Sequence, residues 1–233
     1  AGLIKQDEMF DCENGEYRMG PRILHDHHAY SKLSVTDILV KSSNIGMAKI
    51  GERLTNRGLY NATVKFGFGR PTGIDLPGEL SGILRPLKQW NGYSTGSIPM
   101  GHELAVTPLQ LVTAQSALAN GGRLITPRIL KGVQGHRSDS AASFQASLED
   151  PTVSEPATIV RPTVSSEAAR WVIEKPMAEV VSRGTGHRAK IPGYSVFGKT
   201  GTAQKMDPEN GGYSKTLHSS SFICGAPARN PKV

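Results

Sequence analysis

The sequence has few cysteines and contains no long apolar run. Its only cysteines, Cys12 and Cys224, lie near opposite ends of the 233 residues and form no CxxC pair. Two free thiols are the simpler interpretation, and a single disulfide between them is the alternative. Because no run of about 18 apolar residues is present, no segment of this sequence is predicted to span a membrane.

Positive charge is in excess, but it is not clustered. The formal net charge is +7 and the pI is about 9.5, a balance that suits nucleic acid or an anionic surface such as a membrane or cell wall. No block of five basic residues occurs, and aromatic residues make up only 6% of the chain. We therefore expect no nucleic-acid partner. The chain also begins without Met or a signal-like segment, so we expect it to be part of a longer protein.

What the sequence does contain is typical of a globular chain. Hydrophobic residues make up 37% and charged residues 20%, and the length of 233 residues is enough for one large domain or two lobes. The 26 glycines predict many turns. Periodicity and turn residues then predict the elements. They are a hairpin within 10–19 turning at Asn14 and Gly15, two amphipathic helices within 34–54 that break near Lys41–Asn44, a loop over 66–92, a helix over 106–122, a strand–turn–strand over 123–133, a surface insertion or mobile loop over 134–163, a helix over 165–183 that Pro176 kinks or ends early, and an antiparallel strand pair over 194–225.

The helix over 106–122 has the clearest local signals. Thr107 can cap it, Pro108 fits its first turn, and Asn120-Gly121-Gly122 should end it. Its expected apolar face consists of Leu109, Leu111, Val112, Ala114, Ala117 and Leu118.

One polar stretch, GKTGT over 198–202, comes at the end of a predicted strand. Lys199 offers a cation for a carboxylate or for a neighbouring hydroxyl, and Thr200 and Thr202 offer hydrogen bonds to an anionic end group. Gly201 leaves room for an incoming backbone or ring, which the strand could bind by strand addition. The alternative is an exposed strand end with a lysine that opposes aggregation.

A second polar stretch, Lys41-Ser42-Ser43-Asn44, falls at the predicted break between two helices. Ser42 and Asn44, two residues apart, can both face one cleft, the serine as a proton shuttle and the asparagine as an amide partner for substrate. The alternative is an ordinary helix cap.

Together these stretches resemble the penicillin-binding protein transpeptidases of class B, the monofunctional branch that acts in septum or side-wall synthesis. ILVKSSNIGMAKIGERL carries a Ser-x-Asn element and GKTGTAQK a Lys-Thr-Gly element, with FGFGRPTGIDLPGE and VTPLQLVTAQSALANGG between them in the family's order. The resemblance covers the chain from Leu3 to Ala226. It implies an α/β (α+β) fold of the penicillin-recognising serine transferase type: an antiparallel sheet flanked by helices, plus a helical lobe. We expect residues 1–233 to form part of one such domain, incomplete at both ends.

The resemblance also implies a chemistry and a location. The family's active serine attacks the D-Ala-D-Ala carbonyl of a peptidoglycan stem peptide, and an amine of a neighbouring stem peptide resolves the acyl-enzyme; β-lactams acylate the same serine. It implies no cofactor, partners among division or elongation proteins, and a place outside the bacterial cytoplasmic membrane. By carry-over, Ser42 relays protons, Asn44 holds the acyl side-chain amide, Lys199 polarises Ser42, and Thr200 and Thr202 bind the terminal carboxylate. The strand backbone around Gly201 and Thr202 aligns the substrate and helps to form an oxyanion hole.

The sequence departs from the family in one respect. No serine is followed three residues later by lysine, so the nucleophile's Ser-x-x-Lys element is expected upstream of Ala1, and this chain alone is expected to be inactive. A β-lactam sensor or non-catalytic penicillin-binding scaffold of the same fold is the alternative function, and a β-lactamase is a further one.

Several other polar and aromatic residues are candidates for a functional role. The run His25-Asp26-His27-His28 invites a metal site, but adjacent side chains on a loop diverge and no second cluster completes a ligand set, so we expect a structural or cleft-rim role. His187, within the basic run Arg183–Lys190, either lines the carboxylate side of the cleft or lies in a solvated turn. Trp90 and Tyr93 either rim the cleft or pack in the interior.

Overall fold

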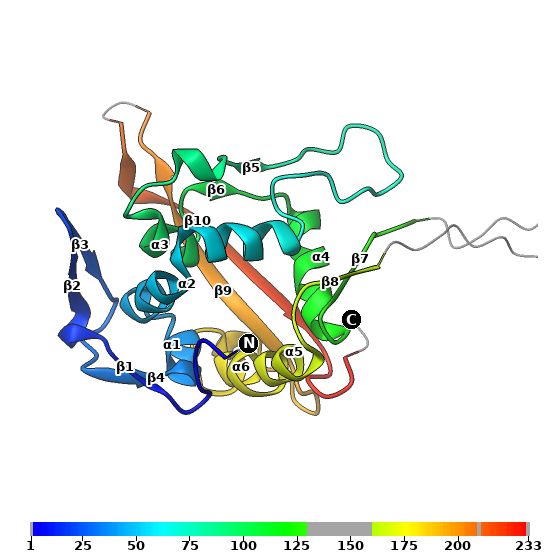
Figure 1. Cartoon of the computed structure of the whole chain (residues 1–233). Helices are drawn as coiled ribbons and strands as arrows, with labels where there is room; N and C mark the ends of the chain where they lie inside the picture. The colour runs from blue at the N-terminus through cyan, green and yellow to red at the C-terminus, as the bar shows by residue number, and fades with distance from the viewer. Residues whose placement is uncertain (1, 130–159, 209–210, 232–233) are drawn as a thin grey trace, which may run out of the picture.

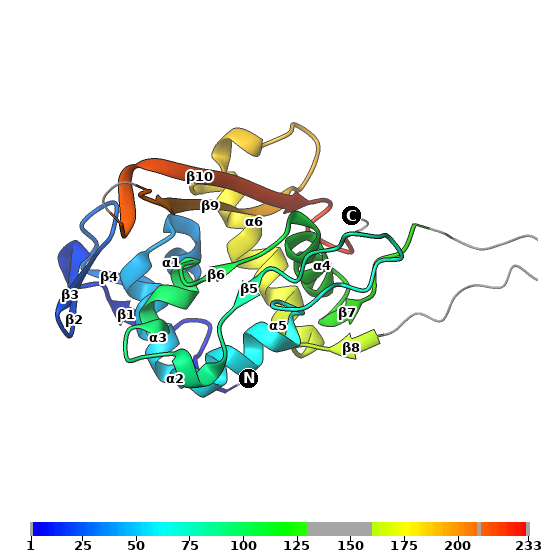
Figure 2. The same cartoon turned by 90° about the horizontal axis from the view of Figure 1, so that it is seen from above.

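The computed structural model describes residues 2–129, 160–208 and 211–231. In it a long two-stranded ribbon, β9 and β10, lies along one side of a group of helices, as Figures 1 and 2 show from two directions. None of the helices in these ranges is long and apolar enough to cross a membrane. The strands are β1 (Met9–Asp11), β2 (Glu16–Met19), β3 (Arg22–His25), β4 (Lys32–Ser34), β5 (Ile83–Leu84), β6 (Leu104–Ala105), β7 (Arg123–Ile125), β8 (Val160–Pro162), β9 (Phe197–Met206) and β10 (Tyr213–Gly225), and the α-helices are α1 (Val35–Lys41), α2 (Asn44–Lys65), α3 (Ser94–Ser97), α4 (Pro108–Ala119), α5 (Ser166–Val172) and α6 (Ala178–Arg183).

The predicted break between two helices is confirmed and lies at Ser42 and Ser43, which we call the α1–α2 turn. Helix α1 ends there because Ser42 takes a left-handed conformation (φ 58°, ψ 46°), which stops the right-handed helix. Ser43 then caps α2, since its side chain accepts a hydrogen bond from the Gly46 N–H. The break therefore leaves Ser42 exposed and Ser43 buried.

The predicted hairpin at Asn14 and Gly15 is wrong. These two residues belong to a single 3₁₀ turn, Glu13–Gly15, that links β1 to β2 without pairing them. Strand β1 pairs instead with β4, and the hairpin is formed by β2 and β3, which turn at Gly20 and Pro21. An Asn-Gly pair satisfies the local turn geometry, but the partner of each strand is chosen by burial of side chains far along the chain.

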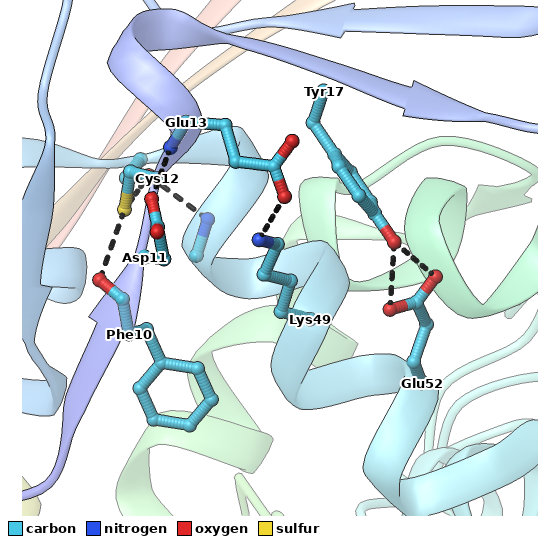
Figure 3. A network of polar contacts seen from close by, with 9 residues as sticks. Phe10, Asp11, Cys12, Glu13, Tyr17, Lys49 and Glu52 are labelled. Carbon is cyan, nitrogen blue, oxygen red and sulfur yellow. Dashed lines mark hydrogen bonds and ion pairs between the residues drawn. The ribbon is translucent and has the colours of Figure 1, made fainter.

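Polar contacts fasten this N-terminal segment to α2 (Figure 3). Lys49 forms an ion pair with Glu13 at 2.5 Å, and the Tyr17 hydroxyl donates to the Glu52 carboxylate at 3.0 Å. Burial together with the Glu52 hydrogen bond raises the pKa of Tyr17 to about 12. Cys12 is fully buried beside them. It and exposed Cys224 are both free thiols, as the simpler interpretation predicted.

Helix α4 confirms the predicted helix and its cap but not the whole predicted apolar face. Thr107 and Gln110 form a reciprocal capping box, with the Thr107 side chain accepting from the Gln110 N–H. The Gln110 side chain is 1% exposed because its amide also donates to the carbonyls of Arg70 and Ser81, each at 2.8 Å. Val112, predicted on the buried face, is 54% exposed.

The insertion predicted over 134–163 is too long at its C-terminal end. Residues 160–162 form β8, which pairs with β7 in an antiparallel register that sets Leu124 opposite Arg161. Among the described residues β8 is the partner of β7. The second strand predicted within 123–133 falls largely outside those residues, and so do residues 134–159 of the predicted insertion.

The helix predicted over 165–183 continues past Pro176. Residues Ile173–Met177 form a π-helical turn between α5 and α6. Proline has no N–H to donate and its ring clashes with the carbonyl four residues earlier, so the wider turn accommodates it without ending the helix. The outcome is a change of helix type at the proline, where a kink or an early end was predicted.

The predicted strand pair over 194–225 is confirmed. Strands β9 and β10 are antiparallel, with Lys199 opposite Ile223 and Gly201 opposite Ser221. Phe197 at the start of β9 is 1% exposed and packs with Ile173 and Met177 of the π turn. This contact fixes the strand against α5 and α6, and the next residues carry the polar side chains of the candidate site.

Candidate active site

The structure brings together Ser42 and Lys199, which lie 157 residues apart in the sequence. The Lys199 Nζ donates a hydrogen bond to the Ser42 Oγ at 2.8 Å and another to the Thr200 carbonyl at 3.0 Å. Ser42 comes from the α1–α2 turn and Lys199 from β9, so the contact joins the helices to the ribbon. A cation held on a hydroxyl oxygen can stabilise that oxygen as it loses its proton.

Lys199 is partly withdrawn from water. Burial disfavours its charged form and lowers the pKa of Lys199 from 10.5 to about 8. An amine with a pKa near 8 is charged in most molecules at neutral pH but releases its proton readily. It can therefore take part in proton transfer as well as in electrostatic stabilisation.

The Thr200 hydroxyl has a neighbour that sequence reasoning missed. The Oγ1 of Thr185 lies 2.7 Å from the Oγ1 of Thr200, and the Thr185 N–H donates to the carbonyl of Val40 in α1 at 3.3 Å. Thr185 thus connects the turn after α6 both to β9 and to α1. Its place in the glycine-flanked stretch GTG was the only sequence signal for this position.

Gly201 and Thr202 lie on the same strand just beyond Thr200. A Cβ on Gly201 would stand 2.6 Å from the Ser221 Oγ, so the position is crowded from the β10 side. Thr202 is exposed and opposite Ser220. Within the described residues β9 pairs with β10 alone, so the other edge of β9 presents backbone groups that an extended peptide can bind.

Asn44 lies at the same turn as Ser42 but makes a different contact. It is the first residue of α2, and its Nδ2 donates to the His25 carbonyl at 2.9 Å. The Asn44 side chain therefore bonds the loop that precedes α1, two residues along the chain from Ser42.

The other residues weighed from sequence have structural contacts. Asp26 accepts hydrogen bonds from the Ser43 hydroxyl and from the Ile45 N–H, and no group of three or more metal-binding side chains occurs in the described part of the chain. His187 lies in a 3₁₀ turn with its ring beside the Gly184 carbonyl.

The two aromatic residues and the basic run also pack or pair. Trp90 is buried against Tyr60, and Arg22 stacks on the Tyr93 ring, so both aromatic side chains pack against neighbours. Arg183 is held by Asp37 at 2.8 Å and by Glu179, contacts that raise the pKa of Arg183.

Comparison with known proteins identifies the family of the chain. The family model described as penicillin-binding protein transpeptidase domain matches residues 1–233. The chain is 33% identical to penicillin-binding protein PbpB of Mycobacterium tuberculosis over 99% of this chain and 33% of that protein. It is also 34% identical to stage V sporulation protein D of Bacillus subtilis over 99% and 34%. It therefore spans about a third of the length of these curated relatives.

Solved structures give the same result. Penicillin-binding protein 3 of M. tuberculosis, apo form, matches with a TM-score of 0.85 and 32% identity over 99% of this chain and 50% of that one. The transpeptidase domain of Burkholderia pseudomallei penicillin-binding protein 3 matches with a TM-score of 0.80 and 29% identity over 98% and 62%. The expected fold is thus confirmed, and the chain belongs to the family of penicillin-binding protein transpeptidase domains.

Proposed function

We propose that this chain is part of a peptidoglycan D,D-transpeptidase that cross-links stem peptides by serine acyl transfer. The observation that carries the proposal is the 2.8 Å hydrogen bond from the Lys199 Nζ to the Ser42 Oγ. It joins the Ser-x-Asn element to the Lys-Thr-Gly element, and it does so with a lysine whose pKa is lowered by burial. We further propose that residues 1–233 belong to one transpeptidase domain with a surface insertion before β8.

The proposed chemistry divides between a nucleophile and the residues described above. The active serine of a Ser-x-x-Lys element, which this sequence does not contain, attacks the carbonyl of D-Ala-D-Ala and expels D-alanine. Ser42 relays the proton to the leaving amine, and Lys199 polarises the Ser42 hydroxyl. Asn44 hydrogen-bonds the acyl side-chain amide of the substrate. An amine of a second stem peptide then attacks the acyl-enzyme and forms the cross-link.

The strand β9 has a separate role in binding the peptide end. Thr200 and Thr202 hydrogen-bond the terminal carboxylate, and the backbone around Gly201 and Thr202 aligns the substrate and contributes to an oxyanion hole. The unpaired edge of β9 among the described residues and the position of Thr185 beside Thr200 support this assignment.

The proposed ligands and location follow from the same reaction. Stem peptides that end in D-Ala-D-Ala and the β-lactams that imitate them are the ligands. Penicillin-binding protein 3 of M. tuberculosis, which this chain resembles, has crystal structures in complex with aztreonam and with ampicillin. The reaction requires no cofactor. We propose a location outside the bacterial cytoplasmic membrane, where peptidoglycan lies, and division or elongation proteins as partners.

Acylation by a fluorescent penicillin tests the proposal. A chimera of M. tuberculosis PbpB, in which this chain replaces the matching third of that protein, is expected to form a labelled adduct. In that chimera Ser42→Ala and Lys199→Ala should each reduce the labelling rate by about 100-fold or more, as loss of an acid–base group does. Labelling that survives both substitutions would refute the roles given to these residues.

Two controls accompany the chimera. Lys205→Ala removes an exposed lysine from the same strand and should leave the labelling rate unchanged. The 233 residues alone, without a Ser-x-x-Lys element, should form no stable adduct. A labelled adduct on them would overturn the prediction that this chain is inactive by itself.

A further inference from the structure

The α1–α2 turn is held by a loop that precedes it in the sequence. Each carboxylate oxygen of Asp26 accepts one hydrogen bond from the turn: Oδ2 from the Ser43 hydroxyl at 2.6 Å, and Oδ1 from the Ile45 N–H at 3.1 Å. The neighbouring carbonyl, that of His25, accepts from the Asn44 side chain at 2.9 Å. The loop therefore contacts three consecutive residues, 43 to 45, immediately after Ser42.

These contacts satisfy groups that could not remain unpaired. Ser43 is 1% exposed, so its buried hydroxyl requires a partner, and it meets both Asp26 and the Gly46 N–H. The Ile45 N–H is one of the free donors at the start of α2, where a carboxylate is also favoured by the helix dipole. Asp26 thus fixes the first turn of α2 through both a side chain and the backbone.

The residue immediately before these contacts is the one under conformational strain. Ser42 adopts φ 58°, a region that residues with a Cβ rarely occupy. Its N–H donates to the carbonyls of Ile38 and Leu39, and the Ser43 N–H donates to the Ile38 carbonyl at 2.9 Å, so backbone bonds close the end of α1 around it. Without the Asp26 contacts to Ser43 and Ile45, these backbone bonds alone would oppose relaxation of Ser42 toward an ordinary conformation. Such relaxation would turn the Ser42 hydroxyl away from Lys199.

We propose that Asp26 is a positioning residue: by holding Ser43 and Ile45 it keeps Ser42 in the left-handed conformation that places the Ser42 hydroxyl on the Lys199 ammonium. Its bearing on catalysis rests on the proposed function, in which Ser42 relays protons. The contacts themselves do not depend on that function. The competing interpretation is that Asp26 only caps α2 and contributes stability alone.

A double-mutant cycle on this chain separates the two interpretations. The pKa of Lys199 is measured by NMR with labelled lysine in the unaltered chain, in Asp26→Ala, in Ser42→Ala and in the double variant. Ser42→Ala removes an acceptor from the ammonium and should lower the pKa of Lys199 below about 8. Asp26→Ala should lower the pKa of Lys199 by at least half as much as Ser42→Ala does. Once Ser42 is alanine, Asp26→Ala should lower it no further.

Two outcomes would overturn the proposal. In one, Asp26→Ala leaves the pKa of Lys199 unchanged; in the other, its effect is equally large when Ser42 is alanine, as a direct effect of the Asp26 charge would be. If Asp26→Ala does not fold, Asp26→Asn decides by the same criteria, because it keeps one acceptor and the side-chain size. Failure of the penicillin chimera would leave this measurement interpretable, since no acylation is involved.

Glu79→Ala is the matched control. Glu79 is also a loop carboxylate with three partners, the Thr72 N–H, the Thr72 hydroxyl and the Gly73 N–H, in a turn that makes no contact with Ser42 or Lys199. Its loss should reduce the melting temperature, as a lost cap does, and leave the pKa of Lys199 where it was.

Discussion

Replacing Lys199 by methionine should stabilise the fold at neutral pH. The fall in the pKa of Lys199 from 10.5 to about 8, at about 1.4 kcal/mol for each pH unit, corresponds to about 3.5 kcal/mol that it costs the folded chain to keep the ammonium charged. Methionine keeps the length and apolar volume of the side chain but gives up the hydrogen bonds to Ser42 and Thr200, together about 1–2 kcal/mol. The expected gain at pH 7 is therefore about 1.5–2.5 kcal/mol.

The stability advantage of the methionine variant should depend on pH. Between pH 8 and 10.5 the unfolded chain holds a proton on Lys199 that the folded chain has released, so the unaltered chain gains stability from this group as the pH rises. The methionine variant has no such group. Its advantage should shrink through this window, vanish between about pH 9 and 10, and become a disadvantage of about 1 kcal/mol at pH 10.5.

Urea unfolding followed by circular dichroism, at pH 7 and at steps up to pH 10.5, measures the difference between the two chains. Lys205→Met, an exposed substitution on the same strand, should stay within about 0.5 kcal/mol of the unaltered chain at each pH. Two results would refute the argument from burial. One is a difference in the free energy of unfolding between the two chains that stays constant from pH 7 to 10.5, and the other is a methionine variant that is less stable at pH 7.

Three further substitutions test the backbone by urea unfolding. Thr55 adopts φ 62° and ψ 166° inside α2, so Thr55→Gly should stabilise by about 1 kcal/mol even though a weak cap to Gly58 is lost; destabilisation would contradict the strain. Gly51→Ala places a Cβ 2.0 Å from the Thr95 carbonyl oxygen and should destabilise by about 2 kcal/mol or more, whereas a neutral result would show that α2 and α3 can move apart. Ser42→Gly should stabilise by about 1 kcal/mol while lowering acylation of the chimera, and equal stability would place no strain at Ser42.

The features that the sequence predicted best are those set by residues close together along the chain, such as the ends of helices. Thr107, Pro108 and the residues that follow carry cap, first-turn and stop signals within a few positions, and α4 begins and ends within a residue or two of where they place it. The break between α1 and α2 was predicted for the same reason, because Ser and Asn compete locally for backbone hydrogen bonds. The Lys-Thr-Gly and Ser-x-Asn elements were found as short motifs.

Pairings between distant segments could not be predicted in this way. Asn14 and Gly15 gave a correct turn signal and a wrong strand partner, because β1 pairs with β4 across a hairpin that no local pattern indicates. Gln110 is buried by carbonyls of Arg70 and Ser81 that lie 29 to 40 residues away. Asp26 was considered only as one member of a histidine-rich run, since nothing near it in the sequence shows that it reaches Ser43.

The span of 157 residues between Ser42 and Lys199 has a consequence for biosynthesis. A ribosome synthesises the chain from its N-terminus at about 5–20 residues per second, so Ser42 is made about 8–30 seconds before Lys199. Throughout that interval the strained serine has no ammonium to hold. A nascent chain or a fragment that ends before β9 therefore cannot form the hydrogen bond between Ser42 and Lys199. Formation of that hydrogen bond indicates that β9 has been added to the fold.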